Sequence, residues 1–128
     1  MLLGEFQHNI DAKGRVIVPA KFREELGECF YVTKGLGGCL WAFPPEEWQE
    51  LLKKFKEMPI AGATEAVPDG QGRILIPQVL RDYAGLGKDI TFLGLNTRVE
   101  IWDTQKWTKT NAEFDENAIA EKMELLGL

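Results

Sequence analysis

The sequence is poor in the residues that build metal centres, disulfide frameworks and membrane spans. Its 128 residues include only two cysteines, Cys29 and Cys39, and one histidine, His8. Two cysteines are too few for a disulfide framework, and no metal-ligand spacing joins them to the histidine. No apolar run reaches the length of about 18 residues that a membrane-spanning helix needs, and the start "MLLGEFQHNI" lacks the basic end and long apolar stretch of a secretory signal. We expect a protein of the reduced cytosol, without metal or other cofactor.

Signatures of catalysis are equally scarce. The chain has a single histidine and no nucleophile elbow, metal-binding motif or recognisable pair of catalytic acids. The glycine-rich "GLGG" at 35–38 suggests a phosphate-binding loop, but a strand follows it and no Gly-Lys-Ser/Thr is present, which favours a hairpin loop. His8 occupies an alternating position in a strand, which indicates a half-buried structural side chain. These patterns predict a non-enzyme with no small-molecule substrate.

Positive charge is also in short supply. The chain carries 20 Asp and Glu against 15 Lys and Arg, a net charge of −5. This balance argues against a general nucleic-acid coat, which is usually basic. It leaves room for a local basic edge, because charges farther apart than about 8–10 Å are largely screened in cellular salt. The position of the positive charges therefore matters more than their sum.

What the chain does contain is the same phrase twice. Residues 11–27 read "DAKGRVIVPAKFREELG" and residues 69–85 read "DGQGRILIPQVLRDYAG", a shift of 58 positions. The likeness continues where "CLWAFPPEEW" (39–48) aligns with "RVEIWDTQKW" (98–107) at a shift of 59. Internal repeats indicate two copies of one structural unit. Each copy reads as a turn, a short strand, a short helix, two strands and a helix.

The opening of each phrase predicts a tight turn. Asp11 and Asp69 suit the first position of a turn, where a carboxylate accepts hydrogen bonds from nearby backbone N–H groups. Gly14 and Gly72 can adopt the positive φ that such a turn requires. We therefore expect the two turns to have the same geometry.

The rest of each phrase predicts a strand followed by a helix. The run after each glycine is rich in β-branched residues, short, and bounded by turn residues. Pro19 and Pro77 suit the first turn of a helix, where a missing N–H costs nothing, and a glycine is a usual helix stop. The expected elements are strands over 15–18 and 73–76 and helices that run from these prolines to the neighbourhood of Gly27 and Gly85.

Periodicity predicts the remaining elements. Phe6, His8 and Ile10 alternate with polar residues, as in a half-buried strand. Trp48 and Trp107 occupy equivalent places of the two repeats, which indicates that the tryptophans pack in the core and at interfaces. The tail is expected to form an acidic amphipathic helix with apolar residues from Phe114 to Met123 on one face. The further expected elements are a strand over 63–67 and helices over 44–56, 104–111 and 111–126.

Neither repeat can bury a core alone, so the two are expected to fold together. We predict an α+β, mainly β, fold in which two tandem β-hairpin repeats, 1–60 and 61–128, form one compact domain. The repeats would pair about a pseudo-twofold axis into one small barrel, with short helices on its outside.

These phrases resemble the MraZ family. The resemblance rests on the two Asp-x-x-Gly-Arg turns with their following "(I/V)P", and on "GLGGCLWAFPPEEW", "GATE", "GRILIPQ" and "TRVEIW", and it covers nearly the whole chain. MraZ proteins are related to the AbrB-type swapped-hairpin DNA-binding proteins, so the resemblance implies two tandem AbrB-like repeats. It also implies a ring-shaped homo-oligomer, cytoplasmic and nucleoid-associated. Such a ring would bind direct repeats in the promoter of the operon for cell division and wall synthesis, and would regulate that operon, usually as a repressor.

The resemblance places the family's DNA-binding signature, Asp-x-x-x-Arg, on Asp11 and Arg15 and again on Asp69 and Arg73. Arginine suits this role because its planar fork can clamp a phosphate, or O6 and N7 of guanine, with two hydrogen bonds. The aspartates are expected to shape the turns and orient the arginines, since a carboxylate that faces phosphates is repelled. Without the duplication, a solvated surface turn with an Asp–Arg pair would be the simpler interpretation.

The residues beside the two arginines predict unequal turns. Lys13 adds a charge next to Arg15, whereas Gln71 stands next to Arg73 and offers hydrogen bonds to an adenine edge or a phosphate. We therefore expect Arg15 to contribute more to DNA binding than Arg73. The helical cations Lys21, Arg23 and Arg81 are expected to be solvated or ion-paired, with phosphate contacts as the alternative.

One departure from the family pattern lies between the repeats. MraZ proteins carry a further segment between the residues that match "KKFKEMPI" and "AGATE", whereas Ile60 here meets Ala61 directly. The short junction is natural, engineered or the mark of an omitted stretch, and the sequence leaves all three open. A smaller departure is Pro68-Asp69-Gly70, where the family more often has an apolar residue and a lysine around the aspartate.

The main alternative function is a self-assembling scaffold, natural or engineered, without specific DNA binding. Apolar strands, tryptophans and a tail helix would suit a scaffold, but the repeated Asp-x-x-x-Arg turn would then have no role. A DNA-binding ring accounts for both features. It also answers the objection from net charge, because several copies would join their few arginines into one basic edge.

Overall fold

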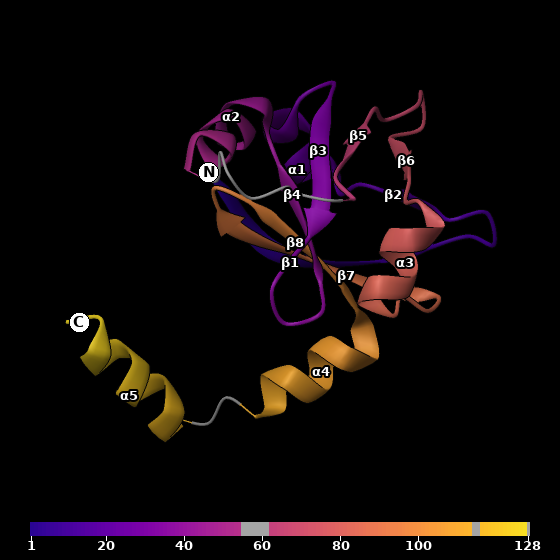
Figure 1. The fold of residues 1–128 in the computed structure, drawn as a ribbon. Coiled ribbons are helices and arrows are strands. Elements are labelled where there is room, and N and C mark those ends of the chain that lie inside the picture. The colour runs from indigo at the N-terminus through magenta and orange to yellow at the C-terminus, as the bar shows by residue number, and fades with distance from the viewer. Residues whose placement is uncertain (55–61, 114–115, 128) are drawn as a thin grey trace.

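A computed structural model of the chain describes residues 1–54, 62–113 and 116–127, which form a mixed α+β fold (Figure 1). The Ile60–Ala61 junction and Phe114 lie outside the described residues. The described strands are β1 (Leu2–Asn9), β2 (Arg15–Ile17), β3 (Phe30–Lys34), β4 (Leu40–Phe43), β5 (Thr64–Ala66), β6 (Arg73–Leu75), β7 (Asp89–Asn96) and β8 (Val99–Asp103). The described helices are α1 (Ala20–Leu26), α2 (Pro45–Lys54), α3 (Gln78–Ala84), α4 (Thr104–Ala112) and α5 (Glu116–Leu125).

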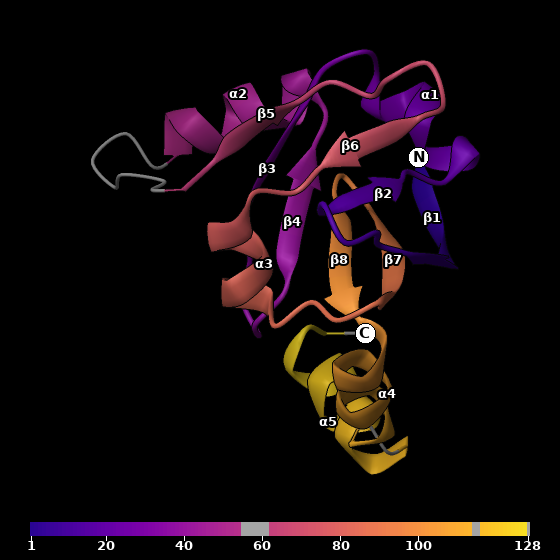
Figure 2. The same ribbon diagram turned by 90° about the vertical axis from the view of Figure 1, so that its right-hand side faces the viewer.

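The strands form two antiparallel layers. Six of them make one sheet in the order β1-β7-β8-β4-β3-β5, and β2 pairs with β6 as a separate two-stranded ribbon. Hydrogen bonding leaves the large sheet open, with β1 at one edge and β5 at the other. The predicted α+β architecture is therefore present, as an open sheet and a ribbon where one barrel was expected. Figure 2 shows the ribbon lying in front of the sheet.

The strand order of the large sheet is symmetric: exchanging each strand for its equivalent in the other repeat gives the same order, counted from the opposite edge. The shift of 58 or 59 positions that relates the repeats carries β1 onto β5, β7 onto β3 and β8 onto β4. Equivalent positions also face each other directly: Val16 pairs with Ile74 in the ribbon, and Trp41 pairs with Glu100 between β4 and β8. A pseudo-twofold axis through these two pairs describes the whole pairing pattern.

Strands of one repeat pair with strands of the other. Strand β1 of the first repeat lies along β7 of the second, and β2 lies along β6. Two backbone hydrogen bonds of 2.9 Å extend the ribbon, from Val18 N to Gly72 O and from Ile76 N to Gly14 O. Each turn is thus bonded to the opposite repeat.

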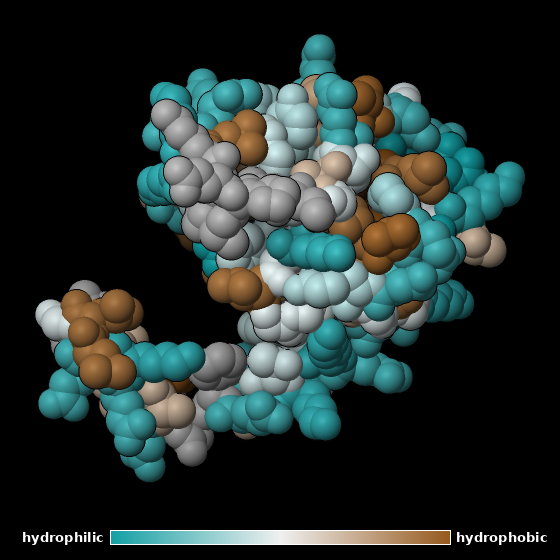
Figure 3. All heavy atoms as spheres, viewed as in Figure 1, coloured by the Kyte–Doolittle hydropathy of each residue, from teal (hydrophilic) through white to brown (hydrophobic). Residues whose placement is uncertain are grey.

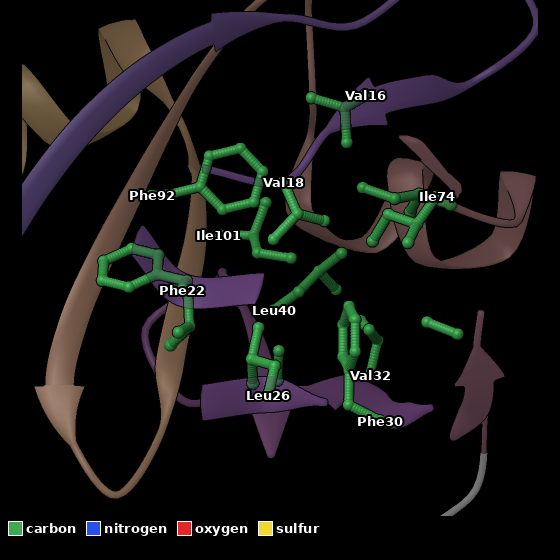
Figure 4. Close-up of a cluster of buried hydrophobic side chains, with 14 of the residues drawn as sticks. Val16, Val18, Phe22, Leu26, Phe30, Val32, Leu40, Ile74, Phe92 and Ile101 are labelled. Atoms are coloured by element: carbon green, nitrogen blue, oxygen red, sulfur yellow. The ribbon is translucent and has the colours of Figure 1, made fainter. Parts of the chain in front are cut away.

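The main core fills the space between the ribbon and the sheet. The inward side chains of the ribbon, Val16 and Ile74, are 1% and 2% exposed. Figure 4 shows Val18, Leu40 and Ile101 meeting near the centre of this cluster. Helices α1 and α3 close it with equivalent buried residues, Phe22 and Leu26 from one repeat and Leu80 and Ala84 from the other.

The outer face of the sheet carries an aromatic cluster built around one buried acid. Glu100 is 8% exposed and accepts hydrogen bonds from Trp41 Nε1 (2.9 Å), Trp102 Nε1 (3.0 Å) and Arg98 Nη2 (3.0 Å). These three donors satisfy a charge that would otherwise be costly to bury. Burial of the neighbouring Cys39 thiol, with a smaller effect of Glu100, raises its pKa to about 12, so this cysteine is held as an inert thiol. Trp48 and Trp102 are buried as predicted, Trp41 and Trp107 are partly buried, and packing at interfaces between chains stays a prediction.

Several local expectations hold and three need correction. His8 is half-buried, edge-on to Phe92 at 6.0 Å, and 35–38 forms the loop of the β3–β4 hairpin. Pro19 and Pro77 precede their helices instead of lying in the first turn, because their ψ values of 132° and 149° keep them extended. The predicted helix over 44–56 is described as α2, which starts at Pro45. The tail does not form one helix over 111–126, since α4 ends at Ala112 and α5 starts at Glu116.

Because the repeats share their strands and their core, we expect them to unfold together. Ile74→Ala should lower the free energy of unfolding by about 2–5 kcal/mol through loss of buried volume at the axis. Chemical denaturation at fixed protein concentration, followed by tryptophan fluorescence, should show one transition at a lower midpoint. The exposed Val79→Ala on α3 serves as control and should change stability by no more than about 0.5 kcal/mol. Two separate transitions would contradict the shared core.

Candidate nucleic-acid interface

The first turn is organised by the carboxylate of Asp11. Oδ1 accepts hydrogen bonds from the backbone N–H groups of Lys13 and Arg15, each at 2.9 Å, and Oδ2 accepts one from Arg15 Nε at 2.9 Å. The backbone closes the turn, with Gly14 N donating to Asp11 O at 3.0 Å. Gly14 has a φ of 87°, which a residue with a Cβ rarely adopts. One side chain therefore fixes both the turn and the direction of its arginine.

The second turn repeats the first, bond for bond. Asp69 Oδ1 accepts from the N–H groups of Gln71 and Arg73, and Oδ2 accepts from Arg73 Nε, all at 2.9 Å. Gly72 N donates to Asp69 O at 2.9 Å, and Gly72 has a φ of 78°. The equal geometry expected from the repeated phrase is present in the structure.

Each arginine keeps its donor edge available. The side chains of Arg15 and Arg73 are 36% and 31% exposed, and their Nε atoms bind the aspartates. Within the part of the chain that the structure describes, their terminal η nitrogens form no hydrogen bond. A guanidinium held by Nε alone retains its η N–H groups for a phosphate or a guanine. The aspartates hold the turns and orient the arginines as expected, and DNA binding by the arginines stays a prediction.

A second pair of arginines packs against the turns from the opposite repeats. Arg81 on α3 lies so close to Gly14 that an added Cβ there would approach its Cζ to 2.7 Å, and Arg81 Nε donates to Ile76 O at 2.9 Å. Arg23 on α1 covers Gly72 in the same way. The sequence predicts solvated or ion-paired cations at both positions, with phosphate contacts as the alternative, and does not indicate this packing on the turns. Their position follows from the pseudo-twofold pairing, which brings each helix onto the other repeat's turn.

The surroundings of the two turns differ in charge. A shallow hollow beside the first turn is lined by Asp11, Arg81 and Lys88, among others. Elsewhere, a hydrogen bond links the two repeats: the thiol of Cys29 in the first repeat donates to Glu65 Oε1 on β5 at 2.7 Å. This hydrogen bond, followed by partial burial, raises the pKa of the Cys29 thiol. Lys13 occupies the place that Gln71 has in the second turn, and Lys88 lines the hollow, so the first turn is the more basic of the two.

The ribbon joins the two turns into one face. Figure 2 shows β2 and β6 side by side with a turn at opposite ends. Hydrophilic side chains gather where the first turn projects at the right of the molecule (Figure 3). The six predicted DNA-binding residues, Asp11, Lys13, Arg15, Asp69, Gln71 and Arg73, therefore lie on one ribbon and its turns. Lys21 is separate from this group and lies over the Phe6 ring at 6.0 Å.

Comparison with known proteins identifies the family. The family model described as "MraZ protein" matches twice, over residues 1–61 and 59–126. The chain belongs to the MraZ family. A "Transcriptional regulator MraZ" of Acetivibrio thermocellus is 50% identical, and those of Clostridium acetobutylicum and Clostridium tetani are 46% and 47% identical. In each case the alignment covers 100% of both chains.

The alignments are longer than the chain itself. The alignment with the MraZ of Acetivibrio thermocellus extends over 143 positions against 128 residues here, a difference of 15. The MraZ relative therefore has residues with no counterpart in this chain, and their place at the Ile60–Ala61 junction stays a prediction. Among solved structures, the solution structure of PHS018 from Pyrococcus horikoshii is 20% identical over 79% of this chain and 88% of its own, with a TM-score of 0.36, too low to support an argument.

The described ranges 1–54, 62–113 and 116–127 contain neither a metal-binding cluster nor a membrane-spanning helix. No group of three or more His, Cys, Asp or Glu side chains there is arranged to hold a metal ion. None of the helices in these ranges is long and apolar enough to cross a membrane.

The hydrogen bonds to the two aspartates predict a pH dependence. They lower the pKa of Asp11 and of Asp69 below the ordinary 3.8, and in each case the largest cause is the backbone N–H of the arginine four residues on. Since the folded pKa is lowered, each carboxylate's stabilisation of its turn is complete above about pH 4 and is lost as the pH falls through the lowered value. NMR titration of the carboxyl carbons should detect both shifts.

The variant Arg15→Met separates the backbone contribution from the ion pair. It should leave the pKa of Asp11 still lowered, because the main donor, the N–H of residue 15, remains. An Asp11 carboxyl that titrated at or above 3.8 in the folded wild type would contradict this geometry.

Proposed function

We propose that this MraZ protein is a sequence-specific DNA-binding repressor of transcription, which acts on direct repeats in the promoter of the operon for cell division and wall synthesis. The observation that carries the proposal is the duplicated turn, in which an aspartate holds an arginine with free η nitrogens at the surface. The relatives in Acetivibrio thermocellus and Clostridium acetobutylicum bear the name of transcriptional regulators, which supports the same class. The expected setting is the cytoplasm, in association with the nucleoid.

The chemistry of the turns suits double-stranded DNA. Arg15 and Arg73 offer η N–H groups that fit a phosphate or the O6 and N7 atoms of guanine. Lys13 adds a positive charge to the first turn, and Gln71 offers a neutral donor and acceptor to the second. Asp11 and Asp69 point their oxygens back into the turns, where backbone N–H groups bind them, so they hold the arginines without facing the phosphates.

Assembly is the second part of the proposal. A single copy carries two such turns on a body with a net charge of −5, which is too little positive charge for tight binding. A ring of copies would place several ribbons along one DNA molecule at fixed spacing and bind them with high effective concentration. We therefore propose a ring-shaped homo-oligomer, with the repeats 1–60 and 61–128 acting as one unit in each subunit.

A scaffold without DNA binding is the second candidate, and the exposed apolar side chains of α5 favour it. Ile119 and Met123 are 43% and 48% exposed, and Leu125 and Leu126 more so, as the brown patch on this helix shows (Figure 3). Such a helix suits contact between protein chains. An exposed apolar helix is equally compatible with a DNA-binding ring, however, and a scaffold alone would leave the two turns without a function. An enzyme is the weakest candidate, since the sequence offers no catalytic framework and the relatives are named as regulators.

The substitution Arg15→Ala should weaken binding to promoter repeats far more than it changes stability. Loss of one phosphate or bidentate base contact costs about 1–3 kcal/mol for each subunit and reduces the salt dependence of binding. Arg73→Ala should cost less, because its turn lacks a basic neighbour. Gel shifts at two salt concentrations, with thermal unfolding of each variant, measure both effects.

Lys109→Ala is the matched control, since Lys109 is an exposed cation on α4, away from the ribbon. It should bind DNA as the wild type does. Wild-type affinity of Arg15→Ala for the promoter repeats would overturn the proposed function. A larger loss from Arg73→Ala than from Arg15→Ala would reverse the order proposed for the two turns.

Light scattering coupled to size exclusion should give a mass that is a multiple of the 14.5 kDa chain. The physical reason is that tight binding requires several ribbons in one particle. A monomer of 14.5 kDa that still bound the promoter tightly would contradict the proposed ring. A second variant carries a helix inserted between Ile60 and Ala61. If this insertion changes the number of subunits in a closed assembly, the short junction has a role in ring size.

A further inference from the structure

The outward face of the ribbon carries two apolar side chains between the two arginines. In the β2–β6 pairing, Arg15 faces Leu75 and Ile17 faces Arg73 across the strands. Between them, Val16 and Ile74 point into the core. Because side chains alternate along a strand, the other four residues project from the opposite side, away from the core. They form a four-residue patch, called here the ribbon patch, with an arginine and an apolar residue on each strand.

Both apolar residues of the ribbon patch are exposed in the free protein. Ile17 is 42% exposed and Leu75 is 59% exposed. Their hydrophobic surface therefore contributes little to folding, while their partners across the strands are the two arginines assigned to DNA binding. Single exposed apolar residues are common on proteins. Here the pseudo-twofold places two of them at equivalent positions in the centre of a proposed binding face.

The spacing of the patch brings these residues to any DNA that both arginines touch. Arg15 and Arg73 are diagonal neighbours in the ribbon, so their backbones lie about 7–8 Å apart. Ile17 and Leu75 occupy the other diagonal of the same four positions. A duplex that approaches both guanidinium groups therefore covers the two apolar side chains as well.

We infer that Ile17 and Leu75 contact thymine methyl groups in the major groove and so help to select the DNA sequence. This inference rests on the proposed function and deepens it. The major groove, about 12 Å wide, admits a two-stranded β-ribbon and displays the thymine methyl groups, whereas the undeformed minor groove is only about 6 Å wide. On the base edges in the major groove, the thymine C5-methyl is the group that a hydrocarbon side chain can cover without leaving a hydrogen-bonding atom unpaired.

The pairing of residue types sets the class of site. On each strand an arginine lies two residues before an apolar residue, so guanine and thymine are the bases that the patch would select together. The pseudo-twofold relates Arg15 and Ile17 to Arg73 and Leu75. Strands β2 and β6 would therefore contact similar short base sequences. A base pair without a methyl under Ile17 or Leu75 would place the side chain against polar atoms and lose affinity.

The test removes the methyl groups from the DNA and leaves the protein unchanged. Promoter repeats are synthesised with deoxyuridine in place of thymidine, which deletes the C5-methyl and keeps the base pairing. The wild-type oligomer should bind the uracil duplex more weakly, by about fourfold for each contacted methyl group. The same two duplexes are then bound to Ile17→Ala and Leu75→Ala, with mass and thermal unfolding measured on each sample. Leu36→Ala, in the exposed loop of the β3–β4 hairpin, is the matched control.

Each outcome decides the inference. The inference is supported if the alanine variants bind the thymine duplex more weakly and distinguish less than the wild type between thymine and uracil. It is overturned, with the proposed function intact, if the wild type binds both duplexes equally while Arg15→Ala still loses affinity. It is also overturned if Ile17→Ala or Leu75→Ala changes the mass of the assembly, which would make the patch a contact between subunits. If wild type binds neither duplex, the inference fails together with the proposed function.

Discussion

The antiparallel pairing of β2 with β6 is the interaction on which the rest of the structure depends. It joins the repeats at Val16 and Ile74, two equivalent residues that bury their side chains on the pseudo-twofold axis. The bonds from Val18 to Gly72 and from Ile76 to Gly14 continue this pairing into the turns. The position of each turn is consequently set by the opposite repeat, and neither turn can form in its observed place without both.

The turns illustrate why hydrogen-bond geometry matters here more than the strength of the ion pairs. Arg15 and Arg73 pair with their aspartates at the surface, where such pairs contribute little to stability. The value of the aspartates lies in binding two backbone N–H groups each, which shapes the loop. Gly14 and Gly72 serve the same end, because they provide a positive φ and leave space for a guanidinium from the other repeat. The result is a pair of pre-organised arginines on an otherwise acidic protein.

The axis is not a perfect twofold, and its departures are informative. At one end the equivalent residues are Val16 and Ile74, which pack alike. At the other end a tryptophan faces an acid, and Trp41 donates a hydrogen bond to Glu100. A perfect twofold axis would place identical residues opposite each other. The hydrogen bond between Trp41 and Glu100 therefore requires that the two repeats differ at this position. The more basic first turn is a second departure, and it affects the proposed interface directly.

Local signals were sufficient to predict much of the fold and of the candidate site. The Asp-x-x-Gly-Arg turns, the short strands after them and the helices that end near Gly27 and Gly85 follow from residue preferences within a few positions. The partners of the strands could not be predicted in this way, since the pairing of β1 with β7 joins residues far apart in the chain. The packing of Arg81 on Gly14 depends on that pairing, so a sequence alone shows only another helical cation. The extended ψ of the two prolines was missed because a proline fixes φ and leaves ψ free.

We propose that the β2–β6 ribbon and its two turns are the surface that faces DNA. Hydrogen exchange of backbone amides, measured on the whole assembly with and without promoter DNA, tests it most directly. We expect DNA to slow exchange mainly in 11–17 and 69–75, with the larger effect in the first segment. Slowed exchange confined to α5 or to the outer face of the sheet, with both turns unchanged, would contradict it.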